Sequence, residues 1–251
     1  MSRLIAAELL KLRTTRVVPG LLVASVALSV LMAALIVLLS STSDIGGGTG
    51  GRLVLSSGGI VAGILALLLG IVTTAGEYRH GTILPTLLTN PDRLRVTVAQ
   101  IVANTLAGAV LGLASVVGTA AVSFPLLASR DVAVALSAAQ VTGIFVGGVC
   151  FAALSGTLGA AFGGLIRNQV VAVSAALLVL FVVEPLVTSL VDGYQRYSLT
   201  GLRVAISGGA AESAGAASGG LPPAWLAALL WTGYALALAV AAAAVGRRRD
   251  I

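Results

Sequence analysis

Charged side chains are scarce in this chain of 251 residues: they make up 10% of it, against about 25% in an average soluble domain. Hydrophobic types account for 58%, and the mean hydropathy is +1.07. A soluble fold of this size needs a polar surface, which so few charges do not supply. A disordered chain is excluded for the same reason. The composition therefore predicts a protein surrounded mainly by lipid.

Cysteine and histidine each occur once. Cys150 has no second cysteine for an internal disulfide, and His80 alone does not supply a zinc site, a triad or a proton relay. The glycine-rich run 46–51 is followed by Arg52 and lacks the Gly-Lys-Ser/Thr of a phosphate-binding loop. We therefore expect a chain that is not an enzyme and holds no metal or cofactor of its own.

Continuous uncharged runs are long enough to cross a bilayer, which needs about 20 apolar residues in a helix. They are rich in Leu and Ala and do not alternate, which favours helices over a barrel. The sequence predicts an all-α membrane protein whose residues 1–251 form a single transmembrane domain. Its six spans are Val17–Leu39, Ser56–Ala75, Val96–Leu127, Leu136–Ile166, Val170–Leu190 and Ala224–Gly246.

The net charge of +6 is a topology signal once the basic residues are located. Six spans place both termini on one side, and eleven of the fifteen basic residues fall on that side. Only Arg52, Arg130, Arg196 and Arg203 fall on the other. We expect cytoplasmic termini and no nucleic-acid partner. Fourteen of the basic residues are arginine, which together with abundant Ala and Gly suggests a GC-rich bacterial source and hence a bacterial plasma membrane.

The segments outside the spans carry further expectations. Residues 1–16 have an apolar stripe of Leu4, Ile5, Leu9 and Leu12, which predicts a helix along the cytoplasmic surface; an extension of the first span is the alternative. Residues 40–55 are rich in Ser and Gly and predict a flexible loop. Residues 191–223 form a longer external loop, whose first half has the pattern of a short amphipathic helix.

Glu184 is the only acid inside a predicted span. A charge at the bilayer centre costs about 3 kcal/mol or more, so an intramembrane acid is a functional hypothesis by default. However, Glu184 lies about 9 Å from the outer end of its span, and Pro185 disrupts the helix there. A structural carboxylate hydrogen-bonded near the outer mouth is favoured over a coupling or substrate role.

Small residues at four-residue spacing predict close helix packing, within one subunit or across a dimer. Asn104, Gln140 and Gln169 predict hydrogen bonds between helices. The small-residue rows are Gly59 and Gly63, Gly108 and Gly112, Gly143 and Gly147, and Ser155, Gly159 and Gly163.

The loop of residues 76–95 is the most organised polar segment. Gly81 suits a tight turn, and Thr82 begins a short amphipathic helix with an apolar stripe. Asn90 is expected to cap the next helix. A plain connector needs no exposed aliphatic stripe, which suits a groove in a partner protein.

This loop and the N-terminal AAELLKLRTTR (Ala6–Arg16) resemble the permease subunits of bacterial ABC-2-type transporters, as does the six-span hydropathy. The resemblance implies that the loop is a coupling helix docking on a separate ATPase subunit, which binds ATP and Mg²⁺. It implies export, and a homodimer or a heterodimer with a similar permease. Family members often have a lysine where this chain has Gln100, which is assigned no role. The implied contact residues are Glu77, Tyr78, Arg79, His80, Gly81, Thr82, Leu84, Leu87 and Leu88.

Two other function classes stay open. The chain is alternatively a membrane scaffold that anchors cytoplasmic proteins without moving a substrate. The third class is an ion-coupled transporter using Glu184, which is disfavoured because the predicted spans hold no other acid. The substrate does not follow from spans dominated by Ala, Leu, Val and Gly.

Overall fold

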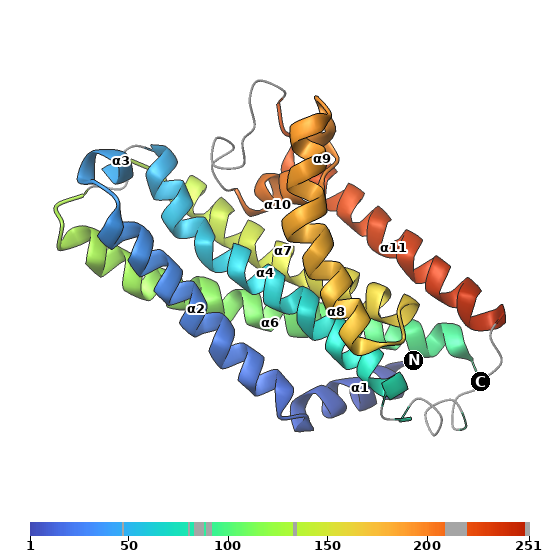
Figure 1. The fold of residues 1–251 in the computed structure, drawn as a ribbon. Helices are drawn as coiled ribbons and strands as arrows, with labels where there is room; N and C mark the ends of the chain where they lie inside the picture. Colours follow the sequence, from blue (N-terminus) through green and yellow to red (C-terminus); the bar gives the residue numbers. More distant parts are fainter. Residues whose placement is uncertain are drawn as a thin grey trace.

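A computed structural model of the chain consists, over the residues it describes, of helices joined by short connections. It describes residues 1–46, 48–79, 81–82, 88, 92–132, 135–208 and 220–248. The elements are α1 (Ser2–Thr14), α2 (Val17–Leu39), α3 (Thr42–Gly46), α4 (Gly48–Arg79), α6 (Arg93–Ala128), α7 (Ala138–Leu165), α8 (Gln169–Leu178), η1 (Val179–Val183), α9 (Glu184–Leu190), η2 (Tyr194–Arg196), α10 (Leu199–Ser207) and α11 (Ala224–Arg248) (Figure 1).

Six helices in the described part of the chain are long and apolar enough to cross a membrane, so the all-α, multi-pass prediction is confirmed. They agree with the predicted spans to within a few residues, except that the second begins earlier. The helix α6, at 36 residues, is about 54 Å long and exceeds the hydrocarbon thickness of about 30 Å. The six are Val17–Leu39, Thr49–Arg79, Leu94–Ala128, Ala138–Leu165, Gln169–Leu190 and Ala224–Ala244.

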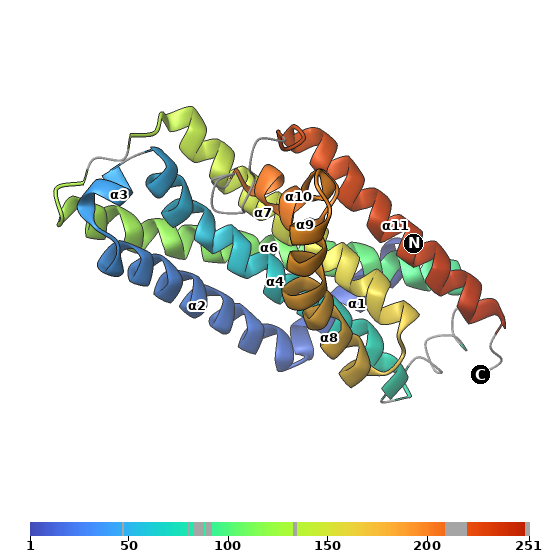
Figure 2. The same ribbon diagram turned by 45° about the horizontal axis from the view of Figure 1, so that its top comes forward.

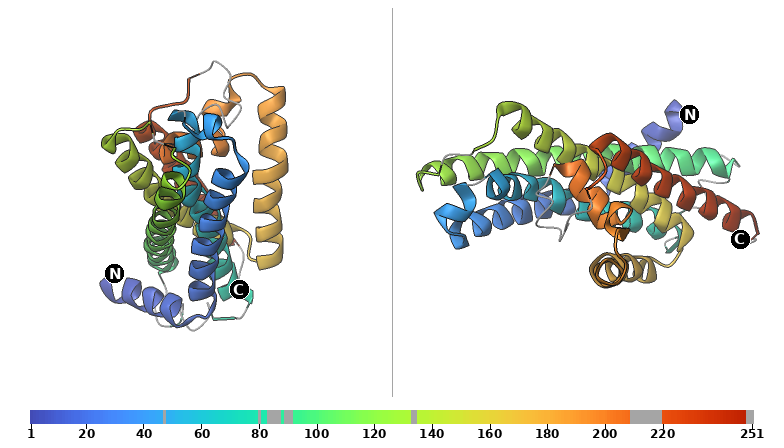
Figure 3. Two further views of the ribbon diagram at one scale, coloured as in Figure 1. Left: turned by 90° about the vertical axis from the view of Figure 1, so that its left-hand side faces the viewer. Right: turned by 90° about the horizontal axis from the view of Figure 1, so that it is seen from above.

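The N-terminal segment is a separate helix, as predicted, and not an extension of the first span. Thr15 has extended backbone angles (φ −79°, ψ 121°), which end α1 before α2 begins. The helix α1 then lies crosswise at one end of the bundle (Figure 3). Its buried side chains, Glu8 and Leu12, lie on the side that packs against the bundle, where α6 is its main neighbour.

The Ser/Gly-rich segment 40–55 is not a flexible loop: it contains α3 and the first turns of α4. Ile45 of α3 is buried beside Val37, Val54 and Leu127, and this apolar cluster holds the segment in place. At Gly50, a Cβ atom would clash with the backbone of Asp44 and Ile45. Glycine has a low helix propensity, but the close contact with α3 requires a glycine at this position of the helix.

The helix α7 is central, because it packs against α4, α6 and α11 (Figure 2). Its contact with α4 depends on glycines, as the small-residue spacing predicts. A Cβ atom on Gly159 would clash with the Leu67 backbone, and one on Gly59 would clash with Gly148. Gly143, on the same helix as Gly159, faces open space. This packing lies within one subunit.

The fifth span, α8–η1–α9, lies at the edge of the bundle in both views of Figure 3. Its middle turn, Val179–Val183, is a π-helix that directly precedes Glu184 and Pro185. Proline has no N–H and clashes with the carbonyl four residues earlier, and a wider turn relieves this clash. The predicted local disruption of the span by Pro185 is confirmed.

We expect Gly159→Leu to destabilise the protein by about 1–3 kcal/mol or more, because the new side chain would force α7 away from α4. Gly143→Leu places the same side chain on the same helix, where nothing lies within 4 Å, and is expected to be neutral. The measurement is the temperature at which the purified protein loses its monodisperse elution peak. Equal losses in the two variants would show that the α4–α7 contact is not decisive.

Candidate functional site

One end of the bundle gathers α1, the end of α4, the start of α6, the α7–α8 connection and the end of α11 (Figure 1). The sequence positions of these elements include most of the basic residues of the chain. We call this the loop end. At the opposite end lie α3, the α6–α7 connection and η2 with α10.

An ion-pair cluster joins α1 to α4 at the loop end. Lys11 Nζ lies 2.7 Å from Glu8 Oε1 on its own helix and 3.0 Å from Glu77 Oε1 on α4. The Glu77 side chain is 11% exposed and that of Lys11 is 41% exposed. A buried carboxylate needs such a partner, because desolvation penalises an unpaired charge. Lys11 thus holds the surface helix against the end of the second span.

Burial lowers the pKa of the Lys11 ammonium, but its hydrogen bonds to Glu8 and Glu77 and their negative charges outweigh this and raise the pKa. A lysine pKa above its ordinary value keeps the side chain charged at neutral pH. The stabilisation it contributes is therefore fully present at neutral pH and is lost only as the pH rises through the raised pKa.

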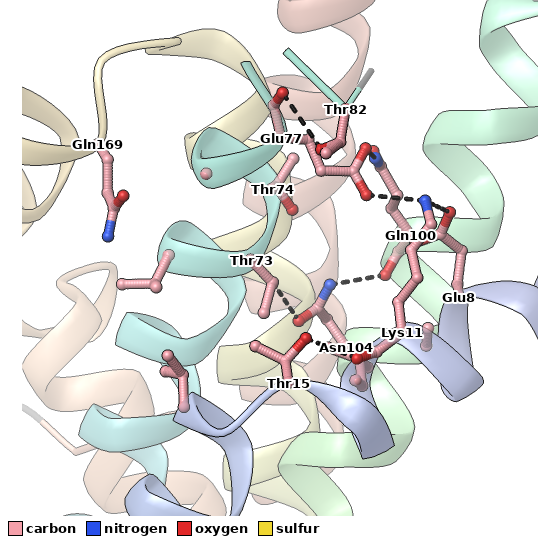
Figure 4. A pocket seen from close by; sticks show the side chains of 15 residues that line it. Glu8, Lys11, Thr15, Thr73, Thr74, Glu77, Thr82, Gln100, Asn104 and Gln169 are labelled. Atoms are coloured by element: carbon pink, nitrogen blue, oxygen red, sulfur yellow. Dashed lines mark hydrogen bonds and ion pairs between the residues drawn. The ribbon is translucent and has the colours of Figure 1, made fainter. Parts of the chain in front are cut away.

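A chain of hydrogen bonds continues from Glu77 into α6 and back to α4 (Figure 4). Gln100 Nε2 donates to Glu77 Oε2 at 2.8 Å, and Asn104 Nδ2 donates to the Gln100 carbonyl at 2.9 Å. Thr73 Oγ1 donates to Asn104 Oδ1 at 2.8 Å. Thr73 and Glu77 are four residues apart on α4, as are Gln100 and Asn104 on α6, so each pair presents one face to the other helix. Three helices are thereby joined by polar contacts.

These residues surround a cavity of about 450 Å³ that is drawn in Figure 4. Thr15 lines it from the α1–α2 connection, and Gln169 lines it from the start of α8. The cavity therefore lies where the surface helix meets four of the spans. The described part of its polar lining consists of amide, hydroxyl and paired ionic groups.

The predicted coupling residues are not all directed outward. The Arg167 guanidinium lies 5.0 Å from the centre of the Tyr78 ring, a cation–π distance that joins the loop to the α7–α8 connection. Glu77 is turned into the cluster described above. Arg79 is exposed, and Leu88 is 80% exposed.

The turn predicted at Gly81 is confirmed, since Gly81 has a positive φ of 67°. Thr82 Oγ1 lies 3.4 Å from the Glu77 carbonyl. Of the predicted contact residues, His80, Leu84 and Leu87 lie outside the described residues.

The cap of α6 is Asp92 and not Asn90, which lies outside the described residues. An Asp92 carboxylate oxygen accepts hydrogen bonds from the N–H groups of Leu94 (3.1 Å) and Arg95 (3.3 Å). A capping side chain reaches the N–H groups two and three residues ahead, which fixes the helix start at Arg93.

Glu184 is 3% exposed and acts as a helix cap in the structure. Its two carboxylate oxygens accept hydrogen bonds from the N–H groups of Leu199 (2.7 Å) and Thr200 (2.8 Å), the first two residues of α10. The Ser198 hydroxyl accepts from the N–H of Gly201, and the N–H of Ser198 itself donates to the Tyr194 carbonyl at 3.0 Å. The four N–H groups that a helix start leaves unpaired are thus all satisfied. Glu184 is therefore hydrogen-bonded to the start of another helix, which supports the favoured structural interpretation.

Sequence reasoning missed Glu8, Gln100 and Thr73 as members of the cluster. The expected role of Asn104 in interhelical hydrogen bonding is confirmed by its bond with Thr73. Gln140 instead completes a capping box with Ser137 at the start of its own helix. The sequence signal that points to these residues is a pair of polar side chains four residues apart on each of two consecutive helices, Thr73 with Glu77 and Gln100 with Asn104.

Models of known protein families give no match to this chain, and curated proteins give none either. Among the described residues, no group of three or more His, Cys, Asp or Glu side chains is placed to hold a metal ion. The functional argument therefore rests on the site itself.

We expect a double-mutant cycle with Lys11→Met and Glu77→Gln to give a coupling energy of about 1 kcal/mol, because the pair is partly buried. The measurement is thermal or denaturant-induced unfolding in detergent. The control pair is Asp92→Asn with Arg95→Met, which removes an exposed ion pair of 2.9 Å while keeping a capping oxygen. It should couple by less than about 0.5 kcal/mol. Coupling no larger than that of the control pair would contradict the role given to Lys11.

Proposed function

We propose that this chain is the membrane-spanning subunit of an ABC-2-type transporter in a bacterial plasma membrane. A separate ATPase subunit, which binds ATP and Mg²⁺, docks on the loop end and drives substrate movement, in the direction of export. A second permease, identical or similar, completes the pathway. The N- and C-termini are cytoplasmic. The proposal draws on the resemblance of the Ala6–Arg16 and Glu77–Arg95 segments to such permeases.

The observation that carries the proposal is the polar linkage between α1, α4 and α6. A motor that pushes on the loop after α4 moves the bundle only if the loop is rigidly joined to the spans. Lys11, Glu77 and Gln100 supply such a connection, since they join the surface helix to two spans within the last turns before the loop. Packed side chains and hydrogen-bond networks are the means by which coupling travels in proteins.

Arg79 and Leu88 are exposed among the described residues of this loop, and one is basic and the other apolar. A partner groove with an apolar floor and an acidic rim suits this pair. Glu77 and Tyr78 contribute indirectly, because they hold the base of the loop against α1, α6 and the α7–α8 connection.

The ion-coupled alternative is weakened by the use of Glu184 as the cap of α10. A carboxylate that takes up a proton during each cycle would lose acceptor capacity and release part of the first turn of α10. The scaffold alternative differs from the transporter in one measurable respect, because a scaffold binds its partner without changing the partner's ATP turnover.

Co-purification tests the docking surface. We expect Arg79→Glu with Leu88→Asp to abolish retention of a co-expressed candidate ATPase subunit, because the changes reverse the charge and remove the apolar contact. The matched control is Val191→Asp with Asp192→Lys at the opposite end of the bundle, where both residues are exposed, and it should retain the ATPase. Equal retention by both double variants would show that this loop is not the docking surface.

Orientation is tested with single cysteines after Cys150→Ala, since Cys150 is the only native cysteine. A membrane-impermeant maleimide added to intact cells should label Asp192→Cys, whereas Arg79→Cys should be labelled only after the membrane is opened. The reason is that loops rich in Lys and Arg stay in the cytoplasm. The reverse pattern would place the loop end outside and would exclude docking of a cytoplasmic ATPase there.

A further inference from the structure

A second cavity, of about 470 Å³, lies between the fifth span and the rest of the bundle. Its walls are apolar and come from four spans; they include Leu67 of α4, Phe162 of α7, Ala176 of α8 and Ala237 of α11. This volume is in the range of sites that bind small molecules. Among the described residues, none lines both this cavity and the one at the loop end.

The cavity is accessible from the side of the bundle. Among the helix pairs with substantial contact, in the described part of the chain, none joins the fifth span to α11. The two diverge toward the loop end in Figure 1. Phe181 and Val182 on the fifth span and Leu236 on α11 are exposed, so these outer surfaces face hydrocarbon. A ligand of the cavity therefore arrives from the lipid.

One end of the cavity is polar. Tyr194, Tyr197 and Tyr234 line it there together with the buried Glu184 carboxylate. Tyr234 Oη donates to the Tyr197 carbonyl at 2.9 Å, which ties α11 to the segment before α10. Burial and the negative charge of Glu184 raise the pKa of Tyr194, so its hydroxyl is protonated at neutral pH. Tyrosines suit the level where hydrocarbon gives way to polar groups.

The charges of the lining favour one class of polar end. The Glu184 carboxylate lies at this end, and the described lining residues include no lysine or arginine; the largely buried Arg203 of α10 interacts with the Glu184 charge but does not line the cavity. A carboxylate or phosphate would meet a like charge in a low-dielectric site without an opposing cation in the lining. An ester or hydroxyl group needs only a hydrogen-bonding partner. The Tyr234 and Tyr194 hydroxyls already donate to the Tyr197 carbonyl and to Glu184, so the Tyr197 hydroxyl is the donor that would serve it.

We propose that this cavity binds the hydrocarbon chain of a single-chain amphiphile with an uncharged polar end, which it takes from the membrane. The polar end lies at the tyrosines and Glu184, and the chain runs along Ala176 and Ala237 toward the loop end. The site does not depend on the proposed transport function, because it is built from contacts within this chain alone.

The test uses methyl stearate carrying a nitroxide quencher and the fluorescence of Trp231, which is one turn before Tyr234 on α11. The chain has two tryptophans, so Trp225→Phe leaves Trp231 as the only one. In phosphatidylcholine nanodiscs, we expect quenching that saturates and that unlabelled methyl stearate reverses. A nitroxide near the ester should quench more strongly than one at the far end of the chain, because Trp231 is closer to the polar end.

Ala237→Phe fills the cavity from α11 and should abolish the saturable quenching. Ala243→Phe makes the same change on the same helix, where the alanine lines a different hollow between α6 and α11, and should leave it intact. Ala176→Phe, from the facing helix, provides a second blocking variant should Ala237→Phe not give a monodisperse protein. Equal quenching in blocking and control variants would mean that the probe is only surrounding lipid and would overturn the site. Saturable quenching by ionised nitroxide stearate as strong as that by its methyl ester would overturn the selectivity for an uncharged end.

Discussion

A backbone N–H or carbonyl left unpaired in hydrocarbon costs several kcal/mol, and this constraint explains how the helix ends are built. Glu184 accepts from the first two N–H groups of α10. Arg130 does the reverse at the end of α2, where its guanidinium donates to the carbonyls of Val37 (2.7 Å) and Leu38 (3.1 Å). The few charges of this chain are thus used partly to terminate helices. Glu184 lies 15 residues before Leu199, and Arg130 lies 93 residues after Val37. Because each charge belongs to a different segment from the helix end that it caps, it also fixes the two segments relative to each other.

The second constraint is the close approach of α4 and α7. Helices in lipid gain little from the hydrophobic effect, and their association depends on van der Waals contact between backbones. Gly159 against Leu67 and Gly59 against Gly148 allow that contact over several turns. The fifth span has no comparable contact and lies at the edge of the bundle, which leaves the space for the lateral cavity.

The two ends of the bundle differ in the kind of contacts that hold them together. At the loop end, ionic and amide groups join three helices around a polar cavity. At the opposite end, α10 packs through apolar side chains: its Leu202 and Ile206 belong to one buried cluster with Phe151 and Trp231. The first arrangement suits the proposed transmission of force from a partner, and the second packs α10 firmly over the opposite end of the spans.

The number of spans, their approximate bounds and the separate N-terminal helix followed from the sequence, because the length of an apolar run and a break in periodicity are local properties. Glu77 and Glu184 were also singled out from the sequence, but their partners were not predicted. The chain does not mark locally that Lys11 meets Glu77, 66 residues later, or that Glu184 caps a helix 15 residues ahead. The helical start of α4 in a glycine-rich segment was missed for the same reason. Hydropathy decided which segments enter the membrane, whereas the approach of helix backbones in three dimensions decided which polar groups meet there.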